Sequence, residues 1–334
     1  MTKVIALFNN KGGVGKTTLL YHLAWMLHEQ RVRVLVVDLD PQANLTSAFL
    51  DDDTVEKLWS DTGRKTVYGA IAPLLEGEGG VVGAYVHEVE DGLGIVPGDL
   101  LLSKTEQELA TAWPNAGDGN ARAFRVLGAF STVARRAAQA TGAEIVLVDV
   151  GPNLGALNRS ALLACDHVIV PLAPDLYSLQ GLRNLGPTLR TWRQEWAARV
   201  QKAPSGFEAP PGSMQPAGYV VLQHGVRLDR VVGAYDRWLQ RVPGEYRASV
   251  LGIALEESLP LAEDDPYCLG LVKHYHSLVP MAQEARRPVF LLRSMDGAIG
   301  AHQQAVLAAY GHFRALAQSV LAAVGASSLG GLST

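Results

Sequence analysis

A short glycine-rich segment near the start of the chain carries the residues best suited to chemistry. Residues 11–18 read Lys-Gly-Gly-Val-Gly-Lys-Thr-Thr. Glycines let backbone N–H groups approach an anion closely, and a helix that begins here adds its partial positive charge. Lys16 can reach the β- and γ-phosphates of a nucleotide, and Thr17 can ligate Mg²⁺. The predicted phosphate cradle consists of Gly12, Gly13, Val14, Gly15, Lys16, Thr17 and Thr18.

The residues on either side of this segment predict the elements that hold it. Residues 3–8 form a short apolar run, typical of a buried strand. After the loop, apolar residues recur on one face at helical spacing. They are Leu19, Leu20, Leu23, Ala24 and Leu27. A strand, a glycine loop and a helix therefore follow one another, which is the context that a phosphate cradle requires.

Three aspartates follow two further apolar runs. Residues 34–38 read Val-Leu-Val-Val-Asp, which is typical of a parallel strand buried on both faces, and Asp40 follows two residues later. Ligands of open α/β sheets gather at the carboxyl ends of the strands, so Asp38 and Asp40 should lie beside the cradle. A second β-branched run ends in Asp149, an arrangement in which the carboxylate meets the Mg²⁺ shell.

The cradle departs from the ordinary P-loop pattern at its first two positions. Asn10 stands where the ordinary pattern has glycine, and a second lysine, Lys11, opens the loop. This string is the deviant Walker A motif, and with it the chain resembles the ParA/MinD family of ATPases, most closely the short, Soj-like ParA partition proteins. The resemblance covers about residues 3–320. It implies an α/β fold: a three-layer P-loop NTPase with a mostly parallel central sheet flanked by helices.

The resemblance also implies roles for the site residues. Lys11 would contact the phosphates of the nucleotide held by a partner subunit, and Lys16 those of its own. The string Asp-x-Asp-Pro-Gln at residues 38–42 matches the switch I segment of ParA proteins. By that match Asp40 would orient the attacking water, and Asp38 would support Mg²⁺ through its water shell. The catalytic residues would be Lys11, Lys16 and Asp40, and the metal residues Thr17, Asp38 and Asp149.

The segment after Asp149 departs from the family pattern. ParA relatives usually read Asp-x-Pro-Pro at the start of switch II, and here Gly151 stands in the position of the first proline. Glycine in that position would loosen the switch. How closely hydrolysis follows the family is therefore left open by the sequence.

The activity implied by the resemblance is a nucleotide-gated switch. ATP and Mg²⁺ would bridge a homodimer that binds double-stranded DNA non-specifically, and slow hydrolysis would release the DNA. A ParB-like protein or a cargo adaptor would stimulate hydrolysis. The protein would drive partition or positioning of DNA or of another cargo, which the sequence does not name.

Basic residues in the second half of the chain are the candidate DNA contacts. The net charge of −4 does not indicate a nucleic-acid binder, but residues 183–334 carry 15 lysines and arginines against 12 acidic residues. ParA proteins bind DNA through basic residues of this half. We expect the contacts at Arg190, Arg193, Arg227 and Arg230. A solvated surface or a dimer rim is the alternative interpretation.

The rest of the chain predicts further elements. Trp192 and Trp196, on a helix from residue 178 to about 202, should be core or dimer anchors. We expect helices at 66–75, 121–140, 158–164, 229–241 and 297–324, strands at 92–98, 166–174 and 218–223, a strand or helix start at 289–292, and a flexible loop at 113–120. One domain should span residues 1–325, with a surface loop or insertion at 203–216 and a flexible tail at 326–334.

Several other classes of protein lose support. No apolar run approaches the roughly 20 residues that span a membrane, and Met1 leads straight into the first strand, so we expect a cytoplasmic protein that joins the nucleoid when ATP is bound. A MinD-like membrane-positioning ATPase would end in a lysine-rich amphipathic helix, whereas this last helix has only Arg314. A metabolic ligase or a metallochaperone on the same scaffold remains a rival. Cys165 and Cys268 form no CxxC pair and should be buried thiols.

Overall fold

The computed structural model describes residues 2–60, 64–223, 232–255, 258–275 and 277–326. In these residues the strands form one sheet in the order β3-β4-β2-β5-β1-β6-β7-β8. Neighbouring strands run parallel except β3 and β4, which are antiparallel. The strands are β1 (Lys3–Leu7), β2 (Val34–Asp38), β3 (His87–Glu90), β4 (Leu93–Val96), β5 (Ile145–Asp149), β6 (His167–Leu172), β7 (Gln215–Gln223) and β8 (Cys268–Lys273).

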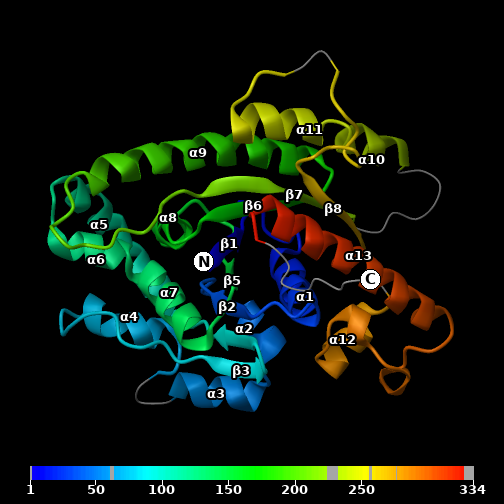
Figure 1. Ribbon diagram of the computed structural model, residues 1–334, viewed down its shortest axis with the longest axis horizontal. Helices are drawn as coiled ribbons and strands as arrows, with labels where there is room; N and C mark the ends of the chain where they lie inside the picture. Colours follow the sequence, from blue (N-terminus) through cyan, green and yellow to red (C-terminus); the bar gives the residue numbers. More distant parts are fainter. Residues whose placement is uncertain (1, 61–63, 224–231, 256–257, 276, 327–334) are drawn as a thin grey trace.

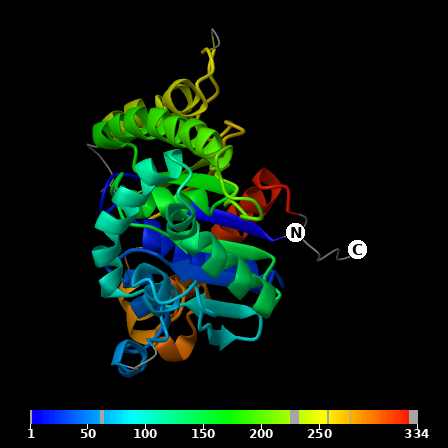
Figure 2. The ribbon, with the colours of Figure 1, turned by 90° about the vertical axis from the view of Figure 1, so that its left-hand side faces the viewer.

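Helices cover both faces of the sheet (Figures 1 and 2). The main helices are α1 (Lys16–Glu29), α2 (Asn44–Phe49), α3 (Asp52–Ser60), α4 (Val67–Leu75), α5 (Glu106–Gly117), α6 (Ala121–Leu127), α7 (Ala129–Thr141), α8 (Ala156–Leu163), α9 (Leu176–Val200), α10 (Val232–Leu239), α11 (Val242–Glu245), α12 (Val279–Ala285) and α13 (Ala301–Ala323). Short 3₁₀ or π-helical segments are η1 (Leu100–Thr105), η2 (Tyr246–Leu251), η3 (Val289–Leu291) and η4 (Ser294–Asp296). The predicted three-layer fold with a mostly parallel sheet is confirmed.

Alternate side chains of β1 point into two separate cores. Val4 and Ala6 pack with buried residues of α4 to α9, whereas Ile5 and Leu7 pack with those of α1, α12 and α13. All of these side chains are inaccessible to solvent, as the apolar strand pattern predicts for a parallel sheet covered on both faces. The carboxyl ends of the central strands are thereby fixed between two packed layers.

The predicted loop at residues 113–120 is wrong. Residues 106–117 form α5, and Pro114 lies inside it. Trp113 is buried and stacks on Trp196 of α9, with ring centroids 6.1 Å apart. Burial of two large aromatic rings outweighs the helix-breaking tendency of Pro114 and Gly117. The prediction that Trp192 and Trp196 are core anchors agrees with their burial.

The predicted helix at 121–140 is two helices, α6 and α7, that meet at Gly128. The ring of Phe207 packs there, and a β-carbon on Gly128 would lie 3.3 Å from it. Phe207 belongs to residues 203–214, which form neither helix nor strand but are tied to the core. The indole N–H of Trp196 donates to the carbonyl of Pro210 at 3.0 Å.

The division into one domain with a tail stays a prediction, because residues 327–334 lie outside the described part.

The C-terminal third adds elements that the sequence analysis missed. Strand β8 extends the sheet beyond β7, and α12 follows it. The final helix α13 lies along α1 (Figure 1), and its Leu316 packs 3.3 Å from where a β-carbon on Gly270 of β8 would be. The expectation that this helix packs on the sheet agrees with that contact. Among the described residues, no helix has the length and apolarity to cross a bilayer.

Two glycines offer a matched test of packing. A β-carbon on Gly186 of α9 would lie 1.9 Å from the carbonyl oxygen of Ser249, whereas one on Gly311 of α13 would meet nothing within 4 Å. We expect Gly186→Ala to lower the free energy of unfolding by about 1–3 kcal/mol. Gly311→Ala should raise it by about 0.5–1 kcal/mol, through helix propensity alone. Urea unfolding measures both, and equal effects would contradict this packing of α9.

Candidate nucleotide-binding site

The predicted phosphate cradle is a tight turn between β1 and α1. Gly13 and Gly15 have φ angles of 71° and 84°, which disfavour any residue with a β-carbon. Asn9 anchors the turn, because its amide donates to the carbonyl of Pro171 at 2.7 Å and its oxygen accepts the N–H of Lys11 at 3.0 Å. No side chain caps the start of α1. Its first N–H groups are therefore left to an anion.

Lys16 begins α1 and is almost fully buried. Its ammonium donates to the carbonyl of Lys11 at 3.4 Å. Burial lowers the pKa of Lys16, while the nearby carboxylates of Asp149 and Asp40 oppose that shift. A buried cation at the mouth of the cradle is what a polyphosphate requires for charge compensation.

Asp149 supplies the best fit to a metal ion. The sheet register pairs it with Asp38, at the ends of β5 and β2. Its Oδ2 accepts the hydroxyl of Thr17 at 2.8 Å, but its buried Oδ1 has no hydrogen-bond partner. Burial, followed by repulsion from Asp38, raises the pKa of Asp149. An unpartnered carboxylate oxygen beside a threonine hydroxyl suits Mg²⁺.

The donor set also indicates which kind of metal site this is. Among the described residues, no group of three His, Cys, Asp or Glu side chains could hold an ion unaided. Mg²⁺ is usually held by one or two protein oxygens together with waters and substrate phosphates. Thr17 and Asp149 fit that pattern. The ion would neutralise charge on a bound polyphosphate.

Asp38 has a positioning role that the sequence did not predict. Its Oδ2 accepts both the N–H and the hydroxyl of Thr46, at 2.9 and 2.7 Å, and its Oδ1 accepts the N–H of Asp40 at 3.2 Å. Burial raises the pKa of this carboxyl, and the bonds from Thr46 oppose that shift. Asp38 therefore orders the backbone from Asp40 to Thr46. Its predicted support of Mg²⁺ through water stays a prediction.

Asp40 faces the segment after β5. Its Oδ1 accepts the N–H of Gln42 at 3.0 Å, and a β-carbon on Gly151 would lie 3.5 Å from the same oxygen. The amide of Asn158 donates to the carbonyl of Gly151 at 2.7 Å. Gly151, which we expected to loosen switch II, is thus held by the side chain of Asn158 in α8. Sequence reasoning missed Asn158 because its partner is a backbone carbonyl.

Lys11 opens the cradle and turns its side chain toward α9. Its ammonium forms an ion pair with Asp175 at the start of α9, and it lies 5.8 Å from the ring centroid of Tyr177. The side chain of Lys11 is 29% exposed. Within a single chain, Lys11 therefore pairs with α9, whereas Lys16 lies near the buried carboxylates.

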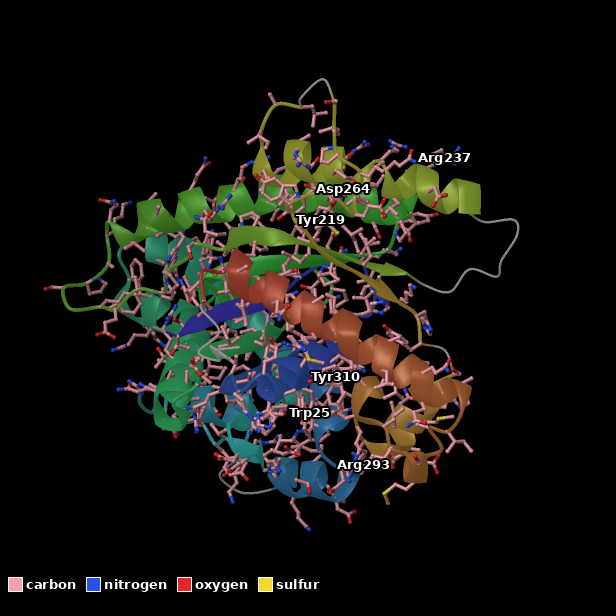
Figure 3. The ribbon with its side chains drawn as sticks, turned by 45° about the vertical axis from the view of Figure 1, so that its right-hand side comes forward. Trp25, Tyr219, Arg237, Asp264, Arg293 and Tyr310 are labelled. Carbon is pink, nitrogen blue, oxygen red and sulfur yellow. The ribbon has the colours of Figure 1, made fainter. Side chains whose placement is uncertain are left out.

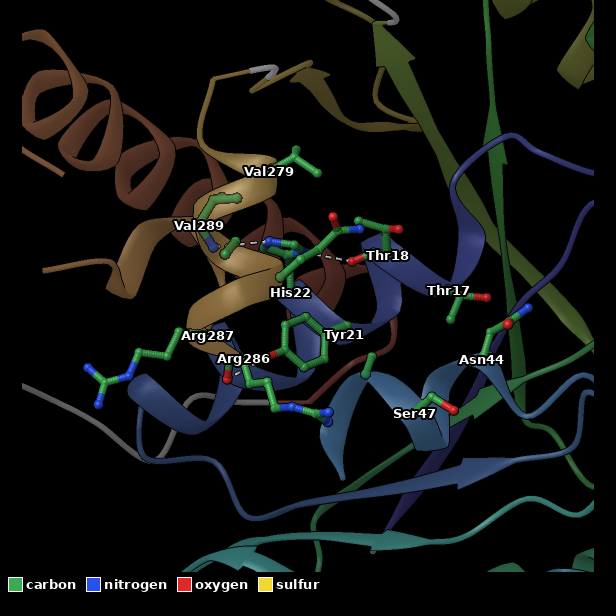
Figure 4. Close-up of a pocket in the computed structure, with 13 residues that line it drawn as sticks. Thr17, Thr18, Tyr21, His22, Asn44, Ser47, Val279, Arg286, Arg287 and Val289 are labelled. Atoms are coloured by element: carbon green, nitrogen blue, oxygen red, sulfur yellow. Dashed lines mark hydrogen bonds between the residues drawn. The ribbon is translucent and has the colours of Figure 1, made fainter. Parts of the chain in front are cut away.

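Two adjoining pockets open beside the first turn of α1. A pocket of about 180 Å³ is lined by residues of the cradle and α1, of the ends of β7 and β8, and of the C-terminal helices, with Leu222, Val272 and Phe313 among its apolar side chains. A larger one of about 600 Å³ lies between α1, α2 and α12 (Figure 4). Both include Thr18 and His22. The smaller, which reaches the carboxyl ends of β7 and β8, suits a flat aromatic ring such as a nucleobase.

The predicted DNA-contact arginines differ in their surroundings. The guanidinium of Arg190 donates to the carbonyls of Ser249 and Val250, at 2.7 and 3.0 Å, so it ties α9 to η2. Burial and the charge of Arg190 lower the pKa of Arg193, which is half-buried. Arg227 and Arg230 lie outside the described residues. In α10, Arg237 is exposed on the outer side of the molecule (Figure 3).

Comparisons with known proteins agree with this geometry. The AAA_31 family model, described as an AAA domain, matches residues 2–202. The chain is 34% identical over 200 residues to the chromosome partitioning protein ParA of Caulobacter vibrioides, which is 60% of this chain and 66% of that protein. It is 35% identical over 189 residues to the chromosome-partitioning ATPase Soj of Thermus thermophilus, 57% of this chain and 62% of that protein. The matches thus span just under two thirds of these relatives.

A solved structure extends the likeness to the remaining residues. Protein DIP2308 from Corynebacterium diphtheriae superposes with a TM-score of 0.66 at 25% sequence identity, covering 97% of this chain and 99% of that one. The match therefore includes the C-terminal third, which the family model leaves out. Together the comparisons confirm the resemblance to ParA-type proteins that the cradle motif predicts.

His22 links the cradle helix to the C-terminal segment and gives a pH prediction. Its Nε2 accepts the N–H of Val289 at 3.2 Å, so Nδ1 carries the proton and donates to the carbonyl of Thr18 at 2.7 Å. Burial lowers the pKa of His22 to about 4. Below the ordinary histidine pKa of about 6.5, His22 is protonated in the unfolded chain but stays neutral in the folded chain. The free energy of unfolding therefore decreases as the pH drops.

We expect this histidine to contribute about 2 kcal/mol of the stability that the protein loses between about pH 7 and pH 5. His22→Gln cannot titrate and should lose correspondingly less over the same range. The check is urea unfolding of both proteins at the two pH values. Identical losses would contradict the neutral, buried state of His22.

Proposed function

We propose, from the premise that this chain belongs to the AAA_31 family of AAA domains, that it is a partition or positioning ATPase that dimerises on ATP. The observation that carries the proposal is the deviant cradle, in which Lys16 is buried among carboxylates while Lys11 is partly exposed and pairs with Asp175. The relatives from Caulobacter vibrioides and Thermus thermophilus are partitioning proteins. Their names support the same kind of activity for this chain.

The first step is binding of ATP with Mg²⁺. The N–H groups at the start of α1 and the ammonium of Lys16 would hold the β- and γ-phosphates. Thr17 and the unpartnered oxygen of Asp149 would hold Mg²⁺. The apolar pocket at the ends of β7 and β8 would take the adenine ring.

Hydrolysis is the second step. Asp40 would orient a water molecule for attack on the γ-phosphate, and Asp38 would keep Asp40 in place through its backbone N–H. The hydrogen bond from Asn158 would hold the backbone of Gly151 next to Asp40. This bond would restrain switch II at the position where the family pattern has a proline. Preorganised groups of this kind accelerate phosphoryl transfer by positioning and charge stabilisation.

Dimerisation would place Lys11 on the nucleotide of a second copy. Two cradles that face one another would each receive a lysine from the partner, so that ATP bridges the homodimer. The closed dimer would present the predicted arginines, Arg190, Arg193, Arg227 and Arg230, as one continuous surface for the DNA backbone. A ParB-like protein or a cargo adaptor would stimulate hydrolysis and release the DNA.

The MinD-like alternative loses support from the packing of α13. Its apolar residues Phe313, Leu316 and Val320 are buried against the rest of the protein. A membrane-binding amphipathic helix must leave that face free. We therefore favour DNA over a lipid surface as the partner.

Two substitutions separate nucleotide binding from hydrolysis. Lys16→Ala should abolish ATP binding, because the buried cation that compensates the phosphate charge is lost. Asp40→Ala should still bind ATP and form a lasting ATP-bound dimer, with hydrolysis reduced by about 100-fold or more. Equilibrium binding of a fluorescent ATP analogue and phosphate release are the measurements. Normal hydrolysis by Asp40→Ala would show that another residue positions the water.

Charge reversal tests the DNA surface. The affinity for DNA falls as salt concentration rises, and the plot of log affinity against log salt concentration has a negative slope. In the variant Arg227→Glu with Arg230→Glu this slope should be less steep by about 2, since each lost phosphate contact removes about 0.9. Arg314→Glu, an exposed position on α13, is the matched control and should leave the slope unchanged. Binding to a random DNA duplex in the presence of ATP is the assay. An unaltered slope in the double variant would rule out these two arginines.

A further inference from the structure

Lys11 already has a partner within its own chain. Its ammonium donates to Oδ2 of Asp175, the residue that begins α9. The two side chains are 29% and 37% exposed, so the pair lies at the surface beside the cradle. A lysine that is to reach a second subunit's nucleotide is thus held by a carboxylate of its own subunit.

Asp175 is fixed in this position by α9. Its Oδ1 accepts the N–H of Ser178 at 2.7 Å, which caps the helix. Burial raises the pKa of Asp175, but the bonds from Lys11 and Ser178 outweigh it and hold the pKa below its usual range. The carboxylate is therefore charged and oriented before any nucleotide binds.

The start of α9 is also packed closely on the cradle. A β-carbon on Gly181 would lie 2.9 Å from the side-chain oxygen of Asn10 and 3.4 Å from that of Asn9. The oxygen of Asn10 is buried without a hydrogen-bond partner. Lys11 and Asp175 hence belong to two segments, the cradle and α9, that pack closely on one another.

Next to the pair lie two exposed apolar side chains. Leu176 is 51% exposed and Tyr177 is 74% exposed. They occupy the first turn of α9, on the side of the cradle to which Lys11 points. Adjacent exposed apolar side chains form a patch of the kind that another protein can cover.

We infer that Asp175 is a latch that holds Lys11 in the monomer and that pairing of two copies across ATP must break this contact. The inference rests on the proposed function, because Lys11 has to leave its own subunit only if it serves a second one. An ammonium carries three N–H donors, but a carboxylate paired with it screens its charge, so the contact with Asp175 weakens the attraction of Lys11 for a partner's phosphate. Asp175 therefore competes with the phosphates and sets how readily the dimer forms.

Asp175→Asn tests the latch and keeps the helix cap, since asparagine caps helices as well as aspartate does. The matched control is Asp166→Asn. Asp166 likewise accepts a backbone N–H, that of Val4 at 2.8 Å, with one oxygen and a cation, Arg135 at 3.0 Å, with the other. It lies at the amino end of β6, away from the cradle.

The first measurement is amine labelling of Lys11 in the nucleotide-free protein, quantified by mass spectrometry. Asp175→Asn should increase the labelling rate of Lys11 by about two- to fivefold, as expected for loss of a partly exposed ion pair. Asp166→Asn should leave the rate at the wild-type value. Equal labelling in wild type and Asp175→Asn would overturn the latch without touching the proposed ATPase function.

The second measurement is the dimer dissociation constant with Mg²⁺ and a non-hydrolysable ATP analogue, obtained by analytical ultracentrifugation. Asp175→Asn should tighten the dimer by about 4- to 25-fold, because each dimer breaks two such pairs. An unchanged or weaker dimer in this variant, with a normal one in wild type, would overturn the latch alone. Absence of a dimer in the wild type would overturn the proposed function and the latch together.

Discussion

The rest of the site depends on one electrostatic constraint, the crowding of carboxylates at the carboxyl ends of β2 and β5. The parallel register sets Asp38 and Asp149 side by side with no exposure to solvent. Thr46 donates to Asp38 and Thr17 to Asp149, which leaves one oxygen of Asp149 without a partner. Buried like charges are tolerated where a cation is expected, so this arrangement accounts for the ammonium of Lys16 and for the predicted Mg²⁺.

The helices around this cluster connect it to distant surfaces. Through His22, the first turn of α1 is bonded to the backbone that precedes α13. On the other side, α9 begins beside the cradle at Asp175, and Arg190 near its middle holds η2. A change in the contacts of Lys11 or of α1 therefore acts directly on long helices, one of which carries Arg190 and Arg193, two of the four arginines that we propose for DNA.

The sequence was most informative where the residue types themselves perform the chemistry. The cradle, the two aspartates of switch I and Asp149 could be found because strand, glycine loop and carboxylate follow in a fixed order. The helix through Trp113 and Pro114 could not, since the burial of Trp113 against Trp196 comes from a distant part of the chain. For the same reason Asn158, Asp175 and strand β8 were missed: their roles arise from backbone carbonyls and ion pairs that only the fold brings together.

The central claim is that Lys11 serves the nucleotide of the other subunit, and mixing two inactive variants tests it most directly. Lys11→Ala lacks the donated lysine, and Lys16→Ala lacks a working cradle. If Lys11 acts across the dimer, the mixed dimer has one complete site, formed by the cradle of the first variant and the Lys11 of the second. Mixing should then restore ATP hydrolysis that neither variant shows alone. A mixture that forms the mixed dimer yet stays as inactive as its components would contradict the account.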